Sequence, residues 1–247
     1  MFSLFKKKVN LEPAAPLSFL QTDMHAHILP GIDDGAKDMA AALMLIEGMY
    51  KLGYKKLIAT PHINIDFYPN SHENILTVLS AVQEAIKIAA IPVEVTAAAE
   101  YMIDEMLMEL LASKTALLTL SGNKVLVEMS YVQESPLMHD ALFALQSSGY
   151  QPILAHPERY NYYHAHPAKY ITQLKNQGFQ MQLNVLALIG HYGKSVQTVA
   201  EHLLKAGLYD YCGTDVHHAH HVNILSGIKK VNTYAALLKY GFMNTEL

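Results

Sequence analysis

The sequence is poor in cysteine and lacks long apolar runs and a positive charge excess, and each shortage excludes a class of protein. The single cysteine, Cys212, excludes an internal disulfide and fits a reducing compartment, so we expect a cytoplasmic location. No apolar run reaches about 18 residues, so no transmembrane segment is expected. The net charge of -4 provides no basic surface for nucleic acid, which is therefore not expected as a partner.

The N-terminal residues do not show the pattern of a regular element. Residues 1–20 include Pro13 and Pro16 and are expected to form an irregular leader, followed by a single domain over residues 21–247. The start, MFSLFKKKVN, does not have the order of a secretory signal, in which charge precedes a longer apolar stretch. A peripheral membrane contact through MFSLFKKK stays open as an alternative.

Strand-like and helix-like segments alternate after residue 20, and a hydrophobic content of 51% supplies a large core. Short apolar runs predict seven strands, at 22–27, 55–60, 92–100, 123–129, 151–156, 179–185 and 208–215. Helical spacing and caps predict helices at 38–52, from 71, from 104, and at 136–148, 167–176, 194–206 and 223–240. This alternation predicts a parallel sheet with right-handed crossovers.

Potential metal ligands lie at or near the ends of most of these strands. They are His25, His27, Asp34, His62, Glu100, Glu128, His156, Asp215 and His217. A charged group at the end of a buried strand is costly unless it is paired or bound to metal, so we interpret the set as one multinuclear metal site. An open sheet concentrates its site where strand order reverses, whereas a closed ring brings many strand ends around one centre. The ligands therefore favour a distorted barrel over an open doubly wound sheet.

Two pairs of donors are placed on one face by their spacing. His25 and His27 flank a single residue, and Asp215 and His217 repeat that spacing. Because side chains alternate along a strand, both members of a pair can reach one cation. Two ordinary surface or core histidines would be the plain interpretation of the first pair alone.

The carboxylates are ambiguous one by one. Asp34, in Asp33-Asp34-Gly35, could belong to a solvated turn, and Glu100 or Glu128 could form a salt bridge at the barrel rim. Their conjunction with the histidines predicts three metal ions that share nine donors. Nitrogen and oxygen ligands without thiolate suit Mn, Fe or Zn.

Arginine is the scarcest charged residue. Lysine makes up 17 of the 18 basic residues, and Arg159, three residues after His156, is the remaining one. A planar guanidinium can hold phosphate by two parallel hydrogen bonds, which lysine cannot. We therefore interpret Arg159 as a phosphate clamp beside the metal site, with a surface salt bridge to Glu158 as the alternative.

The segments TDMHAHILPGIDDGAKD, TPH, AAE, VEMS, AHPERY and GTDVHH, in that order, resemble the polymerase and histidinol phosphatase (PHP) superfamily over roughly residues 20–245. HILPGIDDG and AHPERY resemble most the bacterial manganese-dependent protein-tyrosine phosphatases, which act on tyrosine kinases that regulate capsule and exopolysaccharide synthesis. The resemblance implies an α/β fold of the distorted (β/α)7 TIM-like barrel type. It also implies three divalent ions, with manganese expected first.

The resemblance further implies a role for each matching residue. His25 and His27 with Asp215 would bind one metal, Glu128 and His156 a second, and Asp34, His62 and His217 a third, with Glu100 bridging and Arg159 binding phosphate. Related enzymes usually carry a second arginine after the D-x-H motif, where this chain has Val216 to His221 without arginine. His220 or His221 is the candidate phosphate ligand there, and ordinary loop positions are the alternative.

These observations predict a metal-dependent phosphomonoesterase that hydrolyses phosphotyrosine by direct attack of a metal-bridging hydroxide. The expected partner is a phosphotyrosine protein, namely a bacterial tyrosine kinase. Cys212 lacks a phosphate-cradling loop and is expected to be a buried strand residue. Two alternatives stay open, a histidinol phosphatase or other PHP phosphoesterase, and a metal-loaded scaffold without catalysis. A further hypothesis is an aromatic slot formed by Tyr131, Tyr160, Tyr162 and Tyr163.

Overall fold

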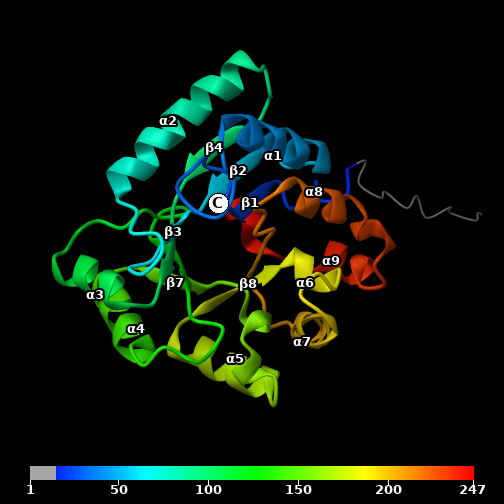
Figure 1. The fold of residues 1–247 in the computed structure, drawn as a ribbon. Helices are drawn as coiled ribbons and strands as arrows, with labels where there is room; N and C mark the ends of the chain where they lie inside the picture. The colour runs from blue at the N-terminus through cyan, green and yellow to red at the C-terminus, as the bar shows by residue number, and fades with distance from the viewer. Residues whose placement is uncertain (1–14) are drawn as a thin grey trace, which may run out of the picture.

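The computed structural model of the protein describes residues 15–247 (Figure 1). Leu17 and Leu20, which were expected in the leader, are buried in the hydrophobic core. The MFSLFKKK segment, with its suggested membrane contact, lies outside the described residues. Within the described range, every helix is too short or too polar to cross a membrane.

The described residues form two parallel sheets. The first contains, in spatial order, β1 (Thr22–Ala26), β2 (Lys56–Ala59) and β4 (Glu94–Ala97). The second contains β3 (His62–Ile63), β5 (Glu100–Met102), β6 (Lys124–Glu128), β7 (Gln151–Leu154), β8 (Gln180–Asn184) and β9 (Tyr211–Gly213). Every pairing within them is parallel, which confirms the expectation from the alternating pattern.

The described residues have more strands than the predicted seven, because β3 forms beyond the predicted strand 55–60 and β5 begins at the last residue of the predicted strand 92–100. β3 follows β2 after Thr60-Pro61, and β5 follows β4 after a similar short gap. Proline has no N–H to donate to a ladder, which accounts for the first break. Across the gaps, Ala98 N donates to Ala59 O at 2.8 Å and Glu100 N donates to Pro61 O at 3.1 Å. The two interrupted segments therefore continue side by side toward the same rim.

The two sheets curl toward each other, so that β1 lies beside β9. His27 N donates to Val216 O at 2.9 Å, and Asp215 N donates to His25 O at 2.7 Å. The enclosed side chains form a second core cluster of Met24, Ile58, Ala98, Leu120, Leu126, Ile153, Ala155 and Tyr211. The carboxyl ends of the strands therefore lie along one curved rim, where the candidate ligands are found.

Helices cover the outer side of the curled sheets, as Figure 1 shows. They are α1 (Met39–Leu52), α2 (His72–Ile88), α3 (Glu105–Ala112), α4 (Met138–Ser147), α5 (Pro167–Gln177), α6 (Val185–Leu188), α7 (Lys194–Lys205), α8 (Ala219–Ser226) and α9 (Tyr234–Lys239). The predicted caps are confirmed, because Asp38 accepts from Ala41 N at 2.8 Å and Ser71 accepts from Asn74 N at 3.1 Å. Gly53 ends α1 in the left-handed region with φ 107°.

The predicted continuous helix over 223–240 is wrong. The chain leaves the helix at Gly227, forms a 3₁₀ turn at Ile228–Lys230, and starts α9 at Tyr234. Glycine is a poor helix former, and the break lets both Ile228 and Leu237 reach the core, where each is fully buried. The short helix α6, directly after β8, was not predicted either.

Candidate metal centre and catalytic cavity

The nine predicted ligands lie together at the carboxyl rim, with Glu100 at their centre. Its Oε2 lies 3.1 Å from His25 Nε2, 3.3 Å from His27 Nε2 and 3.3 Å from His62 Nδ1. Its Oε1 lies 3.0 Å from His156 Nε2. Glu100 is fully buried, so one carboxylate contacts four histidines that lie on or next to three other strands, β1, β3 and β7.

Asp215 closes the other side of the cluster. Its Oδ1 lies 3.3 Å from His25 Nε2, 3.4 Å from His27 Nε2 and 3.5 Å from His217 Nδ1. Asp215 has φ 53° and His156 has φ 35°, so both follow their strands in the left-handed region. Residues other than glycine rarely adopt this backbone conformation, and such outliers cluster at functional sites.

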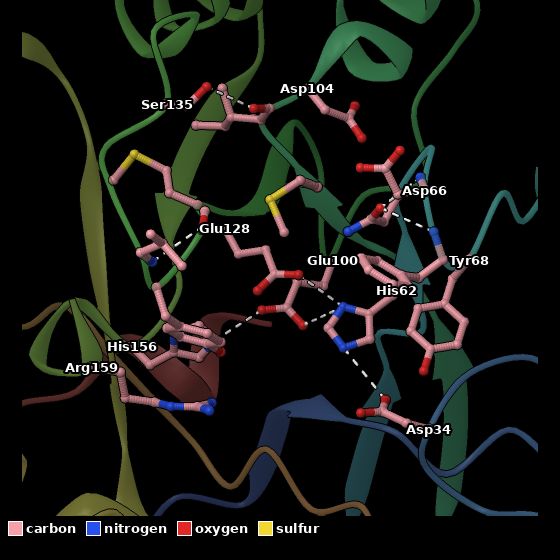
Figure 2. Close-up of a pocket in the computed structure, with 18 of the residues that line it drawn as sticks. Asp34, His62, Asp66, Tyr68, Glu100, Asp104, Glu128, Ser135, His156 and Arg159 are labelled. Atoms are coloured by element: carbon pink, nitrogen blue, oxygen red, sulfur yellow. Dashed lines mark hydrogen bonds and ion pairs between the residues drawn. The ribbon is translucent and has the colours of Figure 1, made fainter. Parts of the chain in front are cut away.

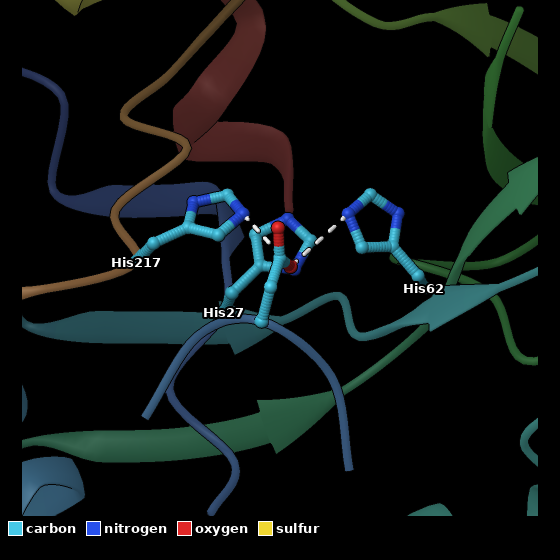
Figure 3. A group of neighbouring side chains, drawn as sticks. His27, His62 and His217 are labelled. Carbon is cyan, nitrogen blue, oxygen red and sulfur yellow. Dashed lines mark ion pairs between the residues drawn. The ribbon is translucent and has the colours of Figure 1, made fainter. Parts of the chain in front are cut away.

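Asp34, His62 and His217, which the resemblance assigns to one metal, lie together on the outer side of the cluster. Asp34 Oδ1 lies 3.3 Å from His217 Nε2 and 3.6 Å from His62 Nε2. Figure 3 shows His62 and His217 on either side of His27. The ring of His27 stacks on that of His217 with centroids 4.0 Å apart.

The grouping of donors differs in one respect from the one that the resemblance implies. Glu128 Oε1 lies 2.9 Å from His62 Nδ1, whereas His156 reaches the cluster through Glu100. Donor atoms within 4.8 Å of one another form three groups in the described chain, namely His27, Asp34, His62 and His217; His25, His27, Glu100 and Asp215; and His62, Glu100 and Glu128. His62 therefore belongs to two groups, and His156 to none of the three.

Two histidine rings are oriented by Gln182 and Asp33, which are not among the predicted ligands. Gln182 Oε1 lies 3.1 Å from His25 Nδ1, and Asp33 Oδ2 lies 2.8 Å from His27 Nδ1. When both rings are neutral and donate through Nδ1–H, both Nε2 atoms carry a lone pair, and they face each other at 3.2 Å. Two lone pairs at this distance cannot hydrogen-bond to each other, so the arrangement suits a cation.

Two further imidazole nitrogens support this interpretation. Nδ1 of His62 and Nδ1 of His156 are buried and have no hydrogen-bond partner. The carboxylate oxygens near His62 Nδ1 lie at ion-pair distances without hydrogen-bond geometry. A buried polar atom without a partner is costly, and coordination to a metal would remove that cost. The residues present therefore fit divalent cations.

The electrostatics of the cluster favour positive charge at its centre. Burial opposes ionisation of Glu100 and Asp215, but the surrounding histidines, His25 first, hold the pKa of both carboxyls well below the ordinary range. Burial acts likewise on Asp34, and His217 lowers its pKa to about 2. All three groups are therefore carboxylates at neutral pH, ready to ligate a metal.

Arg159 lies next to this cluster and is held on three sides. Its guanidinium donates from NH1 to Asp215 Oδ2 at 2.8 Å. Its Cζ lies 4.4 Å from the ring centroid of Tyr131 and 4.1 Å from that of Tyr192. Figure 2 shows it on the same side of the cavity as His156. The geometry supports preorganisation for an anion, because stacking between two rings fixes the plane of the guanidinium.

The alternative salt bridge between Arg159 and Glu158 is not formed. The carboxylate of Glu158 is buried and accepts from Asn184 N at 2.8 Å and from the Tyr209 hydroxyl at 3.0 Å. Burial raises the pKa of Glu158 to about 7. Glu158 thus fixes the loop that carries Arg159 through its hydrogen bonds with Asn184 and Tyr209.

The two predicted phosphate-binding histidines differ in position. His221 is buried at the cavity wall, accepts from His217 N at 3.2 Å through Nδ1, and lies 3.1 Å from His191 through Nε2. Burial, followed by His218, lowers the pKa of His221 to about 3, so its ring is neutral at pH 7. His220 is exposed and does not line the cavity. The structure therefore does not bring His220 to the place where a second arginine was expected.

A cavity of about 920 Å³ leads from the cluster to the surface. Tyr131 lines it, as predicted, and so does Tyr68, whose ring stacks on His62 with centroids 5.5 Å apart. Tyr160, in contrast, is fully buried, and its hydroxyl accepts from Met129 N at 3.0 Å. Tyr163 donates to Glu134 and also lies outside the lining. Of the four predicted slot tyrosines, Tyr131 is thus the one at the wall.

Cys212 is confirmed as a buried residue of β9. Burial raises the pKa of its thiol well above the ordinary value. A thiolate nucleophile is therefore disfavoured at this position.

The fold and the donor set together define a class of protein, a curled parallel α/β domain with a histidine- and carboxylate-rich cluster able to hold metal at its carboxyl rim. A family model described as "Capsular polysaccharide synthesis, CpsB/CapC" matches residues 21–233. The chain belongs to this family.

Individual relatives agree with this assignment. The chain is 30% identical over 196 residues to the tyrosine-protein phosphatase YwqE of Bacillus subtilis, covering 79% of this chain and 76% of the relative. It is 26% identical over 202 residues to the tyrosine-protein phosphatase CpsB of Streptococcus agalactiae, covering 79% and 82%. A crystal structure from a study of YwqE and of CpsB from Streptococcus pneumoniae, described as unique metal-dependent tyrosine phosphatases, superimposes with a TM-score of 0.78 at 26% identity, covering 91% of each chain.

Proposed function

We propose that this protein is a metal-dependent protein-tyrosine phosphatase. The observation that carries the proposal is the position of Arg159, which is stacked between Tyr131 and Tyr192 and joined to Asp215 at the edge of the donor cluster. An oriented guanidinium beside a metal centre is suited to a phosphoryl group. The names of the relatives support the same substrate class.

The proposed cofactors are three divalent ions, with manganese favoured and iron or zinc as alternatives. Their ligands would be His25, His27, Asp34, His62, Glu100, Glu128, His156, Asp215 and His217. Divalent ions bound there would supply Lewis acidity and a water activated for attack on phosphorus. We also propose that the curled sheets count as one (β/α)7 barrel, in which β2 with β3 and β4 with β5 form single interrupted strands.

The residues of the chain itself position the phosphate and the ring. One nitrogen of Arg159 is engaged by Asp215, which leaves its other N–H groups to donate to the non-bridging phosphoryl oxygens. Tyr68 beside His62 and Tyr131 beside His156 wall the approach to the cluster. A phenol has a pKa of about 10, so a tyrosinate can leave without a strong general acid.

The proposed physiological substrate is the phosphotyrosine of a bacterial tyrosine kinase that regulates capsule or exopolysaccharide synthesis, in the cytoplasm. The family description, capsular polysaccharide synthesis, supports this choice. A histidinol phosphatase is the second candidate, because carboxylates at the outer part of the cavity, Asp66 and Glu105, could hold an ammonium group.

The test is phosphate release by the manganese-loaded full chain from a phosphotyrosyl peptide and from histidinol phosphate, side by side, with a chelator control. Preference for the peptide that is lost on chelation supports the proposal. Preference for histidinol phosphate would assign the second candidate. Release from neither substrate would contradict both, and it would favour a metal-loaded scaffold that binds its partner without turnover.

A further inference from the structure

Exposed hydrophobic side chains are concentrated at the outer end of the cavity. Ile65, Phe67 and Val132 line it and are 45%, 75% and 87% exposed. The other large exposed hydrophobic residues of the described chain, apart from Tyr131 at the same cavity, lie on α1, α2 and α4. Exposed apolar surface at the mouth of a cavity is typical of a binding surface, because a bound partner can remove it from water.

The loops that carry these side chains are anchored on both sides of the end of β5. Asn64 and Tyr68 exchange backbone hydrogen bonds of 3.0 and 3.1 Å, which closes a tight turn around Phe67. Ile65 N donates to Asp104 Oδ2 at 2.9 Å. From the opposite loop, Ser135 Oγ donates at 2.8 Å to the carbonyl of the residue before Asp104. The exposed side chains are therefore presented by loops held to one strand end, which lowers the entropy cost of binding.

The same end of the cavity is acidic. Asp66, Glu105 and Glu134 line it and are exposed. Among the described lining residues, Arg159 is the one with a permanent positive charge, and Figure 2 shows it across the cavity from Asp66 and Asp104. Charge is thus separated along the cavity, with a cationic inner end for phosphate and an anionic outer end.

We propose that Ile65, Phe67 and Val132 together with Asp66, Glu105 and Glu134 form a subsite, here named the flank subsite, for the residues next to phosphotyrosine in the substrate. It fits a peptide that carries an apolar side chain and a lysine or arginine beside the phosphotyrosine. The inference rests on the proposed function.

The geometry of the cavity leads to this assignment. A phosphotyrosine whose phosphate reaches Arg159 extends inward past Tyr68 and Tyr131, so its neighbours along the peptide lie at the mouth. There, apolar side chains bury area against Phe67 and Val132, and carboxylates attract a basic side chain while they repel an acidic one. The flank subsite therefore discriminates between phosphotyrosine sites, which the metal cluster and Arg159 cannot do.

The test compares kcat/KM of the manganese-loaded full chain on free phosphotyrosine and on short matched peptides. The peptides carry a leucine and either a lysine, a glutamine or a glutamate beside the phosphotyrosine. We expect the lysine peptide to exceed the glutamate peptide by about tenfold, a difference that shrinks as salt is added.

Two substitutions with matched controls locate the effect. Phe67→Ala and Glu105→Gln should each lower kcat/KM on the lysine peptide by about three- to tenfold. Phe143→Ala, with a side chain 73% exposed on α4, and Glu109→Gln, exposed on α3 outside the cavity, should change nothing. Glu105→Gln should also narrow the ratio between the lysine and glutamate peptides, whereas Phe67→Ala should lower the rates on both.

A binding readout separates docking from turnover. A peptide with a non-hydrolysable phosphonate in place of the phosphate should bind more weakly to Phe67→Ala than to the unaltered protein in fluorescence anisotropy. Equal kcat/KM on all peptides, with free phosphotyrosine still hydrolysed, would overturn the flank subsite and leave the proposed function intact. No hydrolysis of any phosphotyrosyl substrate would overturn both.

Discussion

Arg159 and Asp215 are joined by a hydrogen bond of 2.8 Å between NH1 and Oδ2, while Oδ1 of the same carboxylate lies 3.3 Å from His25 Nε2. One carboxylate therefore sets the distance between the single arginine and the donor cluster. Asn184 Nδ2, at 2.8 Å, and the Tyr192 hydroxyl, at 3.3 Å, donate to the same Oδ2 and hold it in place. The guanidinium of Arg159 and the donor cluster are thus held in place by the same carboxylate.

Replacing Arg159 with alanine should remove phosphate binding and leave the metal ligands in place. Because transition-state donors of this kind contribute about 10²- to 10³-fold, turnover of a phosphotyrosyl peptide should fall by that order. Arg159→Lys restores the charge without the planar fork and should recover only part of the loss. Kinetics and metal analysis on the same samples check this. Loss of metal from Arg159→Ala would instead show that the arginine holds Asp215 for the metal centre.

Asp33 should control metal affinity without touching a metal. In Asp33→Asn, Oδ1 can still accept from Gly35 N, but the amide would donate toward His27 Nδ1 and shift the ring proton to Nε2. Losses of this kind lower metal affinity by about 10- to 100-fold, measurable by manganese titration. Asp38→Asn is the matched control, because asparagine also caps a helix. Equal affinity in both variants would contradict the orienting role of Asp33.

Gly213 should be required because β9 passes close to β1 and β8. A Cβ at this position would lie 2.7 Å from His25 Cβ and 2.8 Å from Gln182 Nε2. Gly213→Ala should therefore lower the free energy of unfolding by about 1–3 kcal/mol and weaken metal binding. Gly241→Ala, where a Cβ meets no atom within 4 Å, is the control. Urea unfolding checks the prediction, and an unaltered midpoint for Gly213→Ala would refute it.

Glu158 should make stability depend on pH. Burial raises its pKa to about 7, above the ordinary value of 4.5, so the folded state binds the proton more tightly than the unfolded state. This contribution is fully present below pH 4.5 and is lost as pH rises through 7. Between pH 4.5 and 7 the free energy of unfolding of the wild type should fall by about 1–3 kcal/mol relative to that of Glu158→Gln. Parallel slopes of unfolding free energy against pH for the two proteins would show that Glu158 is not the cause.

The sequence predicted the repeating architecture well where local signals are strong. Asp38, Ser71 and Gly53 mark helix ends through side-chain caps and positive φ, which depend on a few neighbouring residues. The break at Gly227 was missed because it depends on tertiary packing, in which Ile228 and Leu237 both turn to the core. Local patterns do not contain that information.

In the candidate site, too, residues with a strong local signal could be predicted and residues that depend on tertiary packing could not. Histidines and carboxylates at strand ends could be recognised because they are costly to bury there. Gln182 and Asn184 were missed because neutral amides in a strand carry no such signal, although their spacing of two residues puts both on one face of β8. The pairing of Glu128 with His62 could not be foreseen either, since it depends on how β3 and β6 approach β5.

The most direct test of the proposed metal centre is anomalous X-ray scattering from crystals of the manganese-loaded protein, with data collected on both sides of the manganese absorption edge. We predict separate anomalous peaks in contact with Glu100 and Asp215 and with the imidazoles of His25, His27 and His62. Density at coordination distances of about 2.0–2.3 Å from these atoms would establish the metal centre. If the loaded crystals showed no manganese peak at the cluster, the assignment of a metal centre to these residues would be contradicted.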